Sequence, residues 1–371
     1  MEKLNFKGDK IILLIVIVLS LLSIMMIASA GDRWMEQLRN FGVGFFLLFL
    51  FYHIDYRNVS RFSTPLLIFA GGILLYSLFH SSGARTISLF GMDLQIFYFI
   101  GFCLLLYMAK YIATKLNNDE EPSLNETIKL FGLILAFCGG IFLSNQSTAI
   151  ILFCTCVVVL FAGRIKTKYL AVFCGVIVIA VTLAFSSNIG RVQTFKNRVT
   201  YWHVQTFHDG IPQSKKEKLV FVKLDTHYGK QSILSRAAIS TAPWLPANVG
   251  KGIIKKELPE KDNDYVFSVL VEEMGILVGL FVLFAYLIIL YRTMRIARSA
   301  DGAFGMLLAW GIGFWFCMQA LVHIGVNSFL IPATGQTLPF ISRGGVSLAI
   351  SGAAIGMLMN ISKYEKKECR F

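Results

Sequence analysis

The stretch "LPEKDNDYVFSVLVEEMG", residues 258–275, sets five carboxylates around the start of a long apolar run: Glu260, Asp262, Asp264, Glu272 and Glu273. Pro259 favours a turn at Leu258, and Asp262 or Asn263 can cap a helix that begins near residue 265. Ionised side chains are costly within a bilayer, where they face the protein interior and pair with other groups. The meaning of this stretch therefore depends on whether the chain spans a membrane.

Composition indicates that it does. The chain has 371 residues, of which 56% are hydrophobic and 15% charged, against about 25% charged in a typical soluble domain. A soluble protein of this size could not bury so much apolar surface, whereas lipid covers it in a polytopic membrane protein. Because only helices and closed barrels satisfy the backbone in lipid, we expect an all-α polytopic membrane protein.

Ten apolar segments approach the length of about 20 residues that a membrane helix needs. They predict ten transmembrane helices at residues 11–30, 38–54, 65–81, 93–114, 129–144, 147–164, 169–186, 265–291, 303–327 and 344–362. Residues 1–371 then form a single membrane domain. Its one large loop, residues 187–264, separates the seventh span from the eighth.

The lysine and arginine distribution gives this arrangement a direction. With both termini in the cytoplasm, the inner segments hold 18 of the 35 Lys and Arg and the short outer loops hold 4. Positive charge accumulates on the inner side of membrane proteins, so loop 187–264 is predicted to be extracytoplasmic. It carries 13 Lys and Arg against seven Asp and Glu, which suits anionic headgroups or pyrophosphate; an ordinary solvated loop is the alternative. Nucleic acid is not expected on that side.

Two other stretches stand out in the outer segments. The first is "LIPATGQTLPFISRGG", residues 330–345, which carries one cation, Arg343. Its two prolines and three glycines predict an irregular segment, which is tolerated at membrane depth where protein covers it or a cavity adjoins it. The second is "SGARTISL", residues 82–89, with Arg85.

Other catalytic patterns are missing from the sequence. There is no phosphate-binding Walker loop, no His-Glu-x-x-His and no Gly-x-Ser-x-Gly, so ATP-driven transport and ordinary hydrolysis lose support. The seven cysteines follow no ligand spacing and are interpreted as small packing residues.

Within the opening stretch, Asp264 falls at the outer mouth of the eighth span. Glu272 and Glu273 lie about 12 Å deeper at the helical rise and are expected to pair inside the bundle.

The three stretches together resemble the SEDS family (shape, elongation, division and sporulation), typified by FtsW and RodA. The matching residues are Gly83-Ala84-Arg85; Leu258-Pro259-Glu260, Asp264-Tyr265 and Glu272-Glu273-Met274-Gly275; and Pro332, Gly335, Leu338-Pro339, Ser342 and Gly344-Gly345. Their order and spacing cover essentially the whole chain. The wording around 335–345 is more similar to FtsW-type than to RodA-type members. Gln95 matches the family's fourth-span motif, but Ile96, Phe97 and Tyr98 depart from it.

The resemblance implies a peptidoglycan glycosyltransferase that polymerises lipid II at the outer face of the bacterial cytoplasmic membrane, with inversion, for septal synthesis. It implies Asp264 as the catalytic base, and Arg85, Arg343, Glu260, Gln95 and Ser342 as substrate-binding residues. Supporting roles fall to Glu272, Glu273, Pro332, Gly335, Pro339, Gly344 and Gly345. No cofactor is required by the sequence, although Mg²⁺ or Mn²⁺ is a candidate to stabilise the pyrophosphate.

The implied partners are lipid II, undecaprenyl-linked glycan, a class B penicillin-binding protein and other division or elongation proteins. Three alternatives stay open at this stage: an elongation polymerase, a flippase for the lipid-linked precursor, and a scaffold without catalytic activity. A flippase would hold its charges near the midplane, whereas here the acidic cluster and the basic loop crowd the predicted outer face.

Overall fold

A computed structural model describes residues 7–31, 33–80, 87–89, 92–94, 96–118, 122–186, 190–207, 229–247 and 249–364. The regular secondary structure of the described residues is helical except for one short hairpin. In the hairpin, β1 (Ile87–Leu89) pairs antiparallel with β2 (Met92–Leu94). The expected all-α class is therefore confirmed, with this small addition between two helices.

Seven long helices make up the first half of the chain, with side-chain caps at the starts of α1, α5 and α6. They are α1 (Lys10–Ala30), α2 (Trp34–His53), α3 (Tyr56–His80), α4 (Ile96–Asn117), α5 (Leu124–Ser144), α6 (Gln146–Ala162) and α7 (Thr167–Ser186). Ser123 and Glu126 form a reciprocal capping box at α5, an arrangement that satisfies otherwise unpaired N–H groups.

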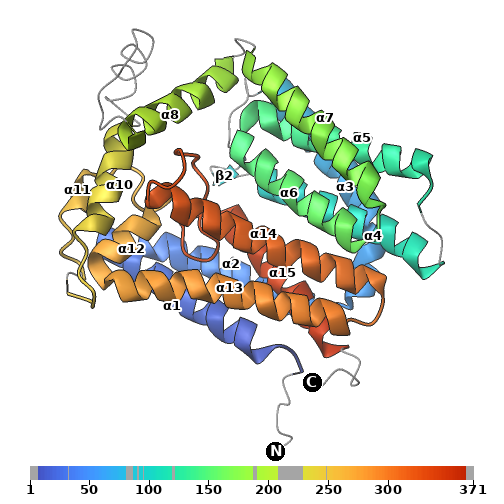
Figure 1. The fold of residues 1–371 in the computed structure, drawn as a ribbon. Helices are drawn as coiled ribbons and strands as arrows, with labels where there is room; N and C mark the ends of the chain where they lie inside the picture. Colours follow the sequence, from blue (N-terminus) through green and yellow to red (C-terminus); the bar gives the residue numbers. More distant parts are fainter. Residues whose placement is uncertain are drawn as a thin grey trace, which may run out of the picture.

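The second half begins with helices of the long segment after α7 and ends with three long elements. The former are α8 (Gly190–Phe207), α10 (Lys230–Ser240) and α11 (Ile254–Glu257). The latter are the pair α12 (Val266–Met274) and α13 (Ile276–Ser299), then α14 (Ala303–Asn327) and α15 (Gly345–Lys363). In Figure 1, α8 runs from the α5–α7 group to α10, which lies beside α11 and α12 at one end of the molecule.

The described helices confirm a polytopic membrane protein. Seven of them are long and apolar enough to cross a bilayer, namely α1, α3, α4, α5, α13, α14 and α15. Helix α6 and the apolar part of α7 are shorter. Ten spans therefore remain a prediction, although a helix lies at each of the ten predicted positions.

Several boundaries differ from those predicted. Helix α14 begins and ends where expected, but α3 starts at Tyr56 rather than at residue 65 and includes Pro65. Its first turns carry Arg57 and Arg61, so hydropathy ends at residue 65 while the helix continues. Polar first turns of this kind lengthen a helix beyond its apolar part.

The eighth predicted span, 265–291, was wrong as a single helix. It breaks at Gly275, where φ is 86° and ψ 166°, a combination essentially confined to glycine. The N–H groups of Ile276 and Leu277 donate to the carbonyls of Pro243 (2.9 Å) and Trp244 (3.3 Å). A Cβ on Gly275 would lie 2.8 Å from the Trp244 oxygen. A loop from before α11 thus occupies the break.

Helix α15 packs tightly along α2. A Cβ on Gly352 would stand 2.0 Å from the backbone oxygen of Gly44, so the two backbones touch as small residues allow in membrane helices. At the far end of α15, the Asn360 amide donates to the Tyr52 carbonyl (2.7 Å) and its oxygen accepts from the Tyr56 N–H (3.0 Å). One polar side chain therefore joins α15 to the α2–α3 connection.

Candidate functional site

The irregular segment 328–344 between α14 and α15 is one part of the candidate site. Gly335 has φ 71°, and the bulky residues Phe329 and Phe340 have φ 64° and 62°, values that are rare without glycine and cluster at functional sites. Ile341 and Ser342 are buried. The segment is non-helical and covered by protein, as predicted from its prolines and glycines.

Three helices hold this segment in place. The Ser23 hydroxyl of α1 donates to the Ile341 carbonyl (2.6 Å), and Gln37 of α2 donates to the Ser23 oxygen (3.0 Å). The Tyr286 hydroxyl of α13 donates to the Pro339 carbonyl. These contacts satisfy carbonyl groups that no regular structure would pair.

The predicted residue Ser342 connects this segment to the acidic stretch. Its hydroxyl accepts from the Leu338 N–H (2.8 Å) and donates to the Asn263 carbonyl (2.8 Å). The neighbouring Arg343 N–H donates to the Asp262 carbonyl (2.8 Å). The structure thus joins the two motifs through the residues immediately before Asp264.

Asp264 is half-buried at the start of α12. Its backbone carbonyl accepts a hydrogen bond of 3.0 Å from Asn327, the last residue of α14. The Asn327 side-chain oxygen also accepts from the Ser268 N–H at 3.0 Å. Sequence reasoning missed Asn327, which is fully buried, because nothing local marks it as a partner of α12.

The predicted cap of α12 by Asp262 or Asn263 was wrong. The residue at the N-cap position is Tyr265, and its side chain forms no capping hydrogen bond. Asn327 replaces a local cap, since it satisfies one of the first N–H groups of the helix from another span. The Oδ1 atoms of Asp262 and Asn263 are buried and have no hydrogen-bond partner among the described residues.

Arg343 adds a cation beside the acidic stretch. Arg343 Nη1 lies 4.0 Å from Asp262 Oδ2, with the Arg343 side chain 29% exposed. The Tyr98 hydroxyl of α4 lies 2.6 Å from Thr337 Oγ1, which joins α4 to segment 328–344. The loose pairing of Arg343 leaves guanidinium donors for an anionic ligand.

The other predicted residues lie in the turn before α12, in segment 328–344 or outside the described residues. Glu260 is exposed, and its backbone carbonyl accepts from Asn263 and Tyr265 in the turn before α12. Pro332, Pro339, Gly335 and Gly344 belong to segment 328–344, and Gly345 begins α15. Arg85 and Gln95 lie outside the described residues, so their substrate-binding roles stay predictions.

Glu272 and Glu273 bind protein groups instead of facing the site. Glu272 accepts from the N–H groups of Ile254 (2.8 Å) and Lys255 (3.1 Å), at the start of α11. Glu273, wholly buried, forms an ion pair with Lys255, which is itself almost fully buried. Ser29 of α1 also donates to Glu273 (2.5 Å). Charges buried in this way need such partners, and Lys255 was not singled out from sequence.

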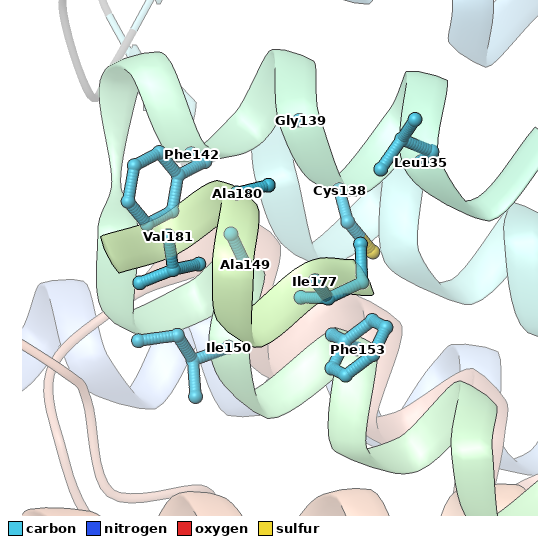
Figure 2. Close-up of a pocket in the computed structure, with 10 residues that line it drawn as sticks. All are labelled: Leu135, Cys138, Gly139, Phe142, Ala149, Ile150, Phe153, Ile177, Ala180 and Val181. Atoms are coloured by element: carbon cyan, nitrogen blue, oxygen red, sulfur yellow. The ribbon is translucent and has the colours of Figure 1, made fainter. Parts of the chain in front are cut away.

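An apolar pocket of about 240 Å³ lies between α5, α6 and α7 (Figure 2). Phe142, Ala149, Phe153, Ile177 and Val181 are among the side chains around it. Ala149 follows Thr148, whose hydroxyl accepts from Gln336 (2.8 Å) in the irregular segment. The pocket is apolar and suits a hydrocarbon chain. Its lining residue Ala149 is next in sequence to Thr148, which contacts segment 328–344.

Metal ligation finds no support in the described part of the chain, where no three His, Cys, Asp or Glu side chains gather closely enough to hold an ion. The site therefore offers a carboxylate, an arginine and hydroxyls. Such groups can move a proton and stabilise an anionic leaving group.

The fold and site define a polytopic helical membrane protein with a half-buried carboxylate beside an irregular, arginine-bearing segment. The chain belongs to the family of FtsW, RodA and SpoVE: the family model, described as "Cell cycle protein", matches residues 8–367. The resemblance predicted from the three motifs is thereby confirmed.

Relatives and solved structures cover nearly the whole chain. Stage V sporulation protein E of Bacillus subtilis (strain 168) is 25% identical over 387 aligned positions, covering 96% of this chain and 98% of the relative. The probable peptidoglycan glycosyltransferase FtsW of Trichlorobacter lovleyi is 28% identical over 380, covering 95% and 93%.

The structural similarity extends over the same length. The crystal structure of Thermus thermophilus rod shape determining protein RodA superposes with a TM-score of 0.68 at 20% identity, covering 98% of this chain and 99% of that one. A chain from the work "Structural coordination of polymerization and crosslinking by a peptidoglycan synthase complex" gives 0.72 at 21% identity, covering 98% and 100%. At these identities the likeness shows a shared fold.

Proposed function

We propose that this protein is a peptidoglycan glycosyltransferase that polymerises lipid II at the outer face of the cytoplasmic membrane, in septal wall synthesis. Family membership and relatives named as probable peptidoglycan glycosyltransferases support the activity. The observation that carries the proposal is the docking of segment 328–344 onto residues 262 and 263, which brings Arg343 beside the acidic stretch that leads into Asp264.

Asp264 acts in this proposal as the general base. The acceptor sugar hydroxyl gives its proton to the carboxylate as its oxygen attacks the anomeric carbon of the lipid-linked donor. The bond from that carbon to the pyrophosphate oxygen breaks, prenyl pyrophosphate leaves, and the configuration inverts. A half-buried carboxylate held by its backbone suits this task, because orientation lowers the barrier to reaction.

Arg343 stabilises the pyrophosphate that leaves, and Arg85 is proposed to share this role. Fixed cationic donors aimed at developing charge lower the barrier. We derive no step through a metal ion, since the described side chains form no ligand set. The apolar pocket between α5, α6 and α7 offers room for part of a prenyl chain close to the site.

A class B penicillin-binding protein is the proposed partner, which would cross-link the strands that this chain polymerises. The fold shared with a chain from a peptidoglycan synthase complex supports such an assembly. Several relatives named FtsW favour division over elongation.

The test is polymerisation of lipid II by the purified protein, with and without its transpeptidase. We expect Asp264→Ala and Asp264→Asn to abolish glycan chains while each variant keeps the thermal stability of the wild type. Glu257→Gln is the matched control, because this exposed carboxylate lies seven residues away and its ion pair with Lys230 spans 4.0 Å.

Two results would reject the proposal. Glycan chains formed by both Asp264 variants would exclude the general base. If the wild type made no glycan but moved labelled lipid across liposomes in an Asp264-dependent way, precursor transport would be the function instead.

A further inference from the structure

Four exposed apolar side chains occur within ten residues of sequence, 244–253, in the loop before α11. Trp244, Leu245, Val249 and Ile253 are 68%, 64%, 46% and 78% exposed. We call these four residues the apolar apex. Single exposed apolar residues are ordinary, but such a set within ten residues marks a surface that water does not cover.

Backbone hydrogen bonds attach the apex to the first turn of α13. The Pro243 and Trp244 carbonyls accept from Ile276 and Leu277, and Gly275 leaves room for them. The apex therefore lies level with the end of α13 that is opposite Arg292, Arg295 and Arg298.

The length of α13 indicates where its first turn lies relative to the hydrocarbon core of the membrane. From Ile276 to Tyr291 the helix has 16 uncharged residues, which rise about 24 Å. The hydrocarbon core is about 30 Å thick. With Arg292 at the opposite boundary, the core extends roughly to or beyond Ile276, where Trp244 and Leu245 are held.

The surface around the apex continues in both directions as a membrane surface would. Leu277, Leu280 and Phe281 of α13 are 47%, 41% and 47% exposed, as lipid-facing side chains are. Lys251 and Lys256, which flank Ile253 in the sequence, are also exposed. Tryptophan favours the membrane interface, and lysine there attracts anionic headgroups.

We propose that the apolar apex inserts into the bilayer at the boundary between headgroups and acyl chains, with Lys251 and Lys256 on the headgroups. The occupant of this surface is the phospholipid bilayer itself. The inference does not depend on the proposed activity. Because Gly275 joins α13 directly to α12, an anchored apex also sets the depth of Asp264 relative to the headgroups.

Tryptophan fluorescence in nanodiscs tests the insertion. The chain has five tryptophans, so the Trp244 signal is the difference between the wild type and Trp244→Phe. We expect lipids brominated near the headgroup end of the chain to remove most of this signal. Lipids brominated near the terminal methyl should remove less, and aqueous acrylamide should have little effect.

Two results would overturn the inference. Efficient quenching by acrylamide but not by brominated lipid would place the apex in water. Quenching by neither would mean that protein covers it, such as a second copy. Leu245→Trp in the Trp244→Phe background is the second variant, since it moves the probe by one residue and should restore quenching by brominated lipid.

Discussion

The amide of Asn327 and the backbone carbonyl of Asp264, 63 residues apart in the chain, are joined by a hydrogen bond of 3.0 Å. The same side chain accepts from Ser268. The end of one span thus fixes the start of the helix that carries the proposed base.

Asn327 is not proposed to contact the substrate. Replacing it should nevertheless reduce polymerisation, because the start of α12 loses this support. Asn327→Ala leaves the Ser268 N–H and the Asp264 carbonyl unpaired, and each buried polar group left unsatisfied costs about 1–3 kcal/mol. We expect a lower thermal midpoint and a drop in kcat larger than any change in KM. Asn327→Asp keeps the acceptor for Ser268 but sets a buried carboxylate oxygen against the Asp264 and His323 carbonyls, so it should be no more stable than Asn327→Ala.

The control for this pair is Asn58→Ala, at an exposed position in α3. Wild-type kcat in Asn327→Ala would show that α12 keeps its place without the bridge.

Removing one member of the buried pair of Lys255 and Glu273 should destabilise the protein strongly. Removing both members should destabilise it much less. Lys255→Met leaves Glu273 as an uncompensated buried charge, which destabilises by about 3–5 kcal/mol. The double variant Lys255→Met, Glu273→Leu removes both charges and should recover most of the loss. Thermal unfolding in detergent, followed for both variants, measures the difference.

The exposed pair of Lys230 and Glu257 is the matched comparison for the buried one. Their side chains are 62% and 67% exposed and 4.0 Å apart, so Lys230→Met should cost at most about 1 kcal/mol. A double variant no more stable than Lys255→Met alone would mean that packing, not charge, explains the effect.

Gly275→Ala should be more harmful than Gly250→Ala. Both glycines have positive φ, 86° and 78°, but a Cβ at Gly250 meets nothing within 4 Å, whereas at Gly275 it would lie 2.8 Å from two atoms of the adjoining loop. Backbone strain of about 1–3 kcal/mol applies to both, and the clash adds to it only at Gly275. Equal thermal midpoints of the two variants would contradict the contact.

Arg343 should affect turnover more than binding. Loss of one donor to developing charge typically lowers kcat by about 10²–10³, so we expect Arg343→Gln to show such a loss and Arg343→Lys a smaller one. Arg295→Gln, exposed at the other end of α13, should keep wild-type kcat. Steady-state kinetics on lipid II would refute the role if Arg343→Gln matched the wild type.

Sequence reasoning predicted what depends on local patterns. Hydropathy placed α14 at residues 303–327, and prolines with glycines predicted the irregular segment before α15. The three motifs predicted the family. Each of these signals is contained in a short window of the chain, and each is independent of what packs against it.

The contacts that shape the site were not predictable in this way. Ser29 and Glu273 are 244 residues apart, and Gln37 and Ser342 are 305 apart. The break at Gly275 lies within a stretch predicted to be one span and depends on carbonyls from residues 243 and 244. Hydropathy cannot distinguish a continuous helix from two helices separated by a loop that fits between them.

The packing of α15 against α2 also sets the order of assembly. During synthesis α2 is made long before α15, and the Tyr52 carbonyl has no Asn360 until nearly the whole chain has been made. Helix α2 is not among those that satisfy the length and hydropathy criteria for a span. Helices α1 and α2 therefore stay incompletely packed until α15 has been made.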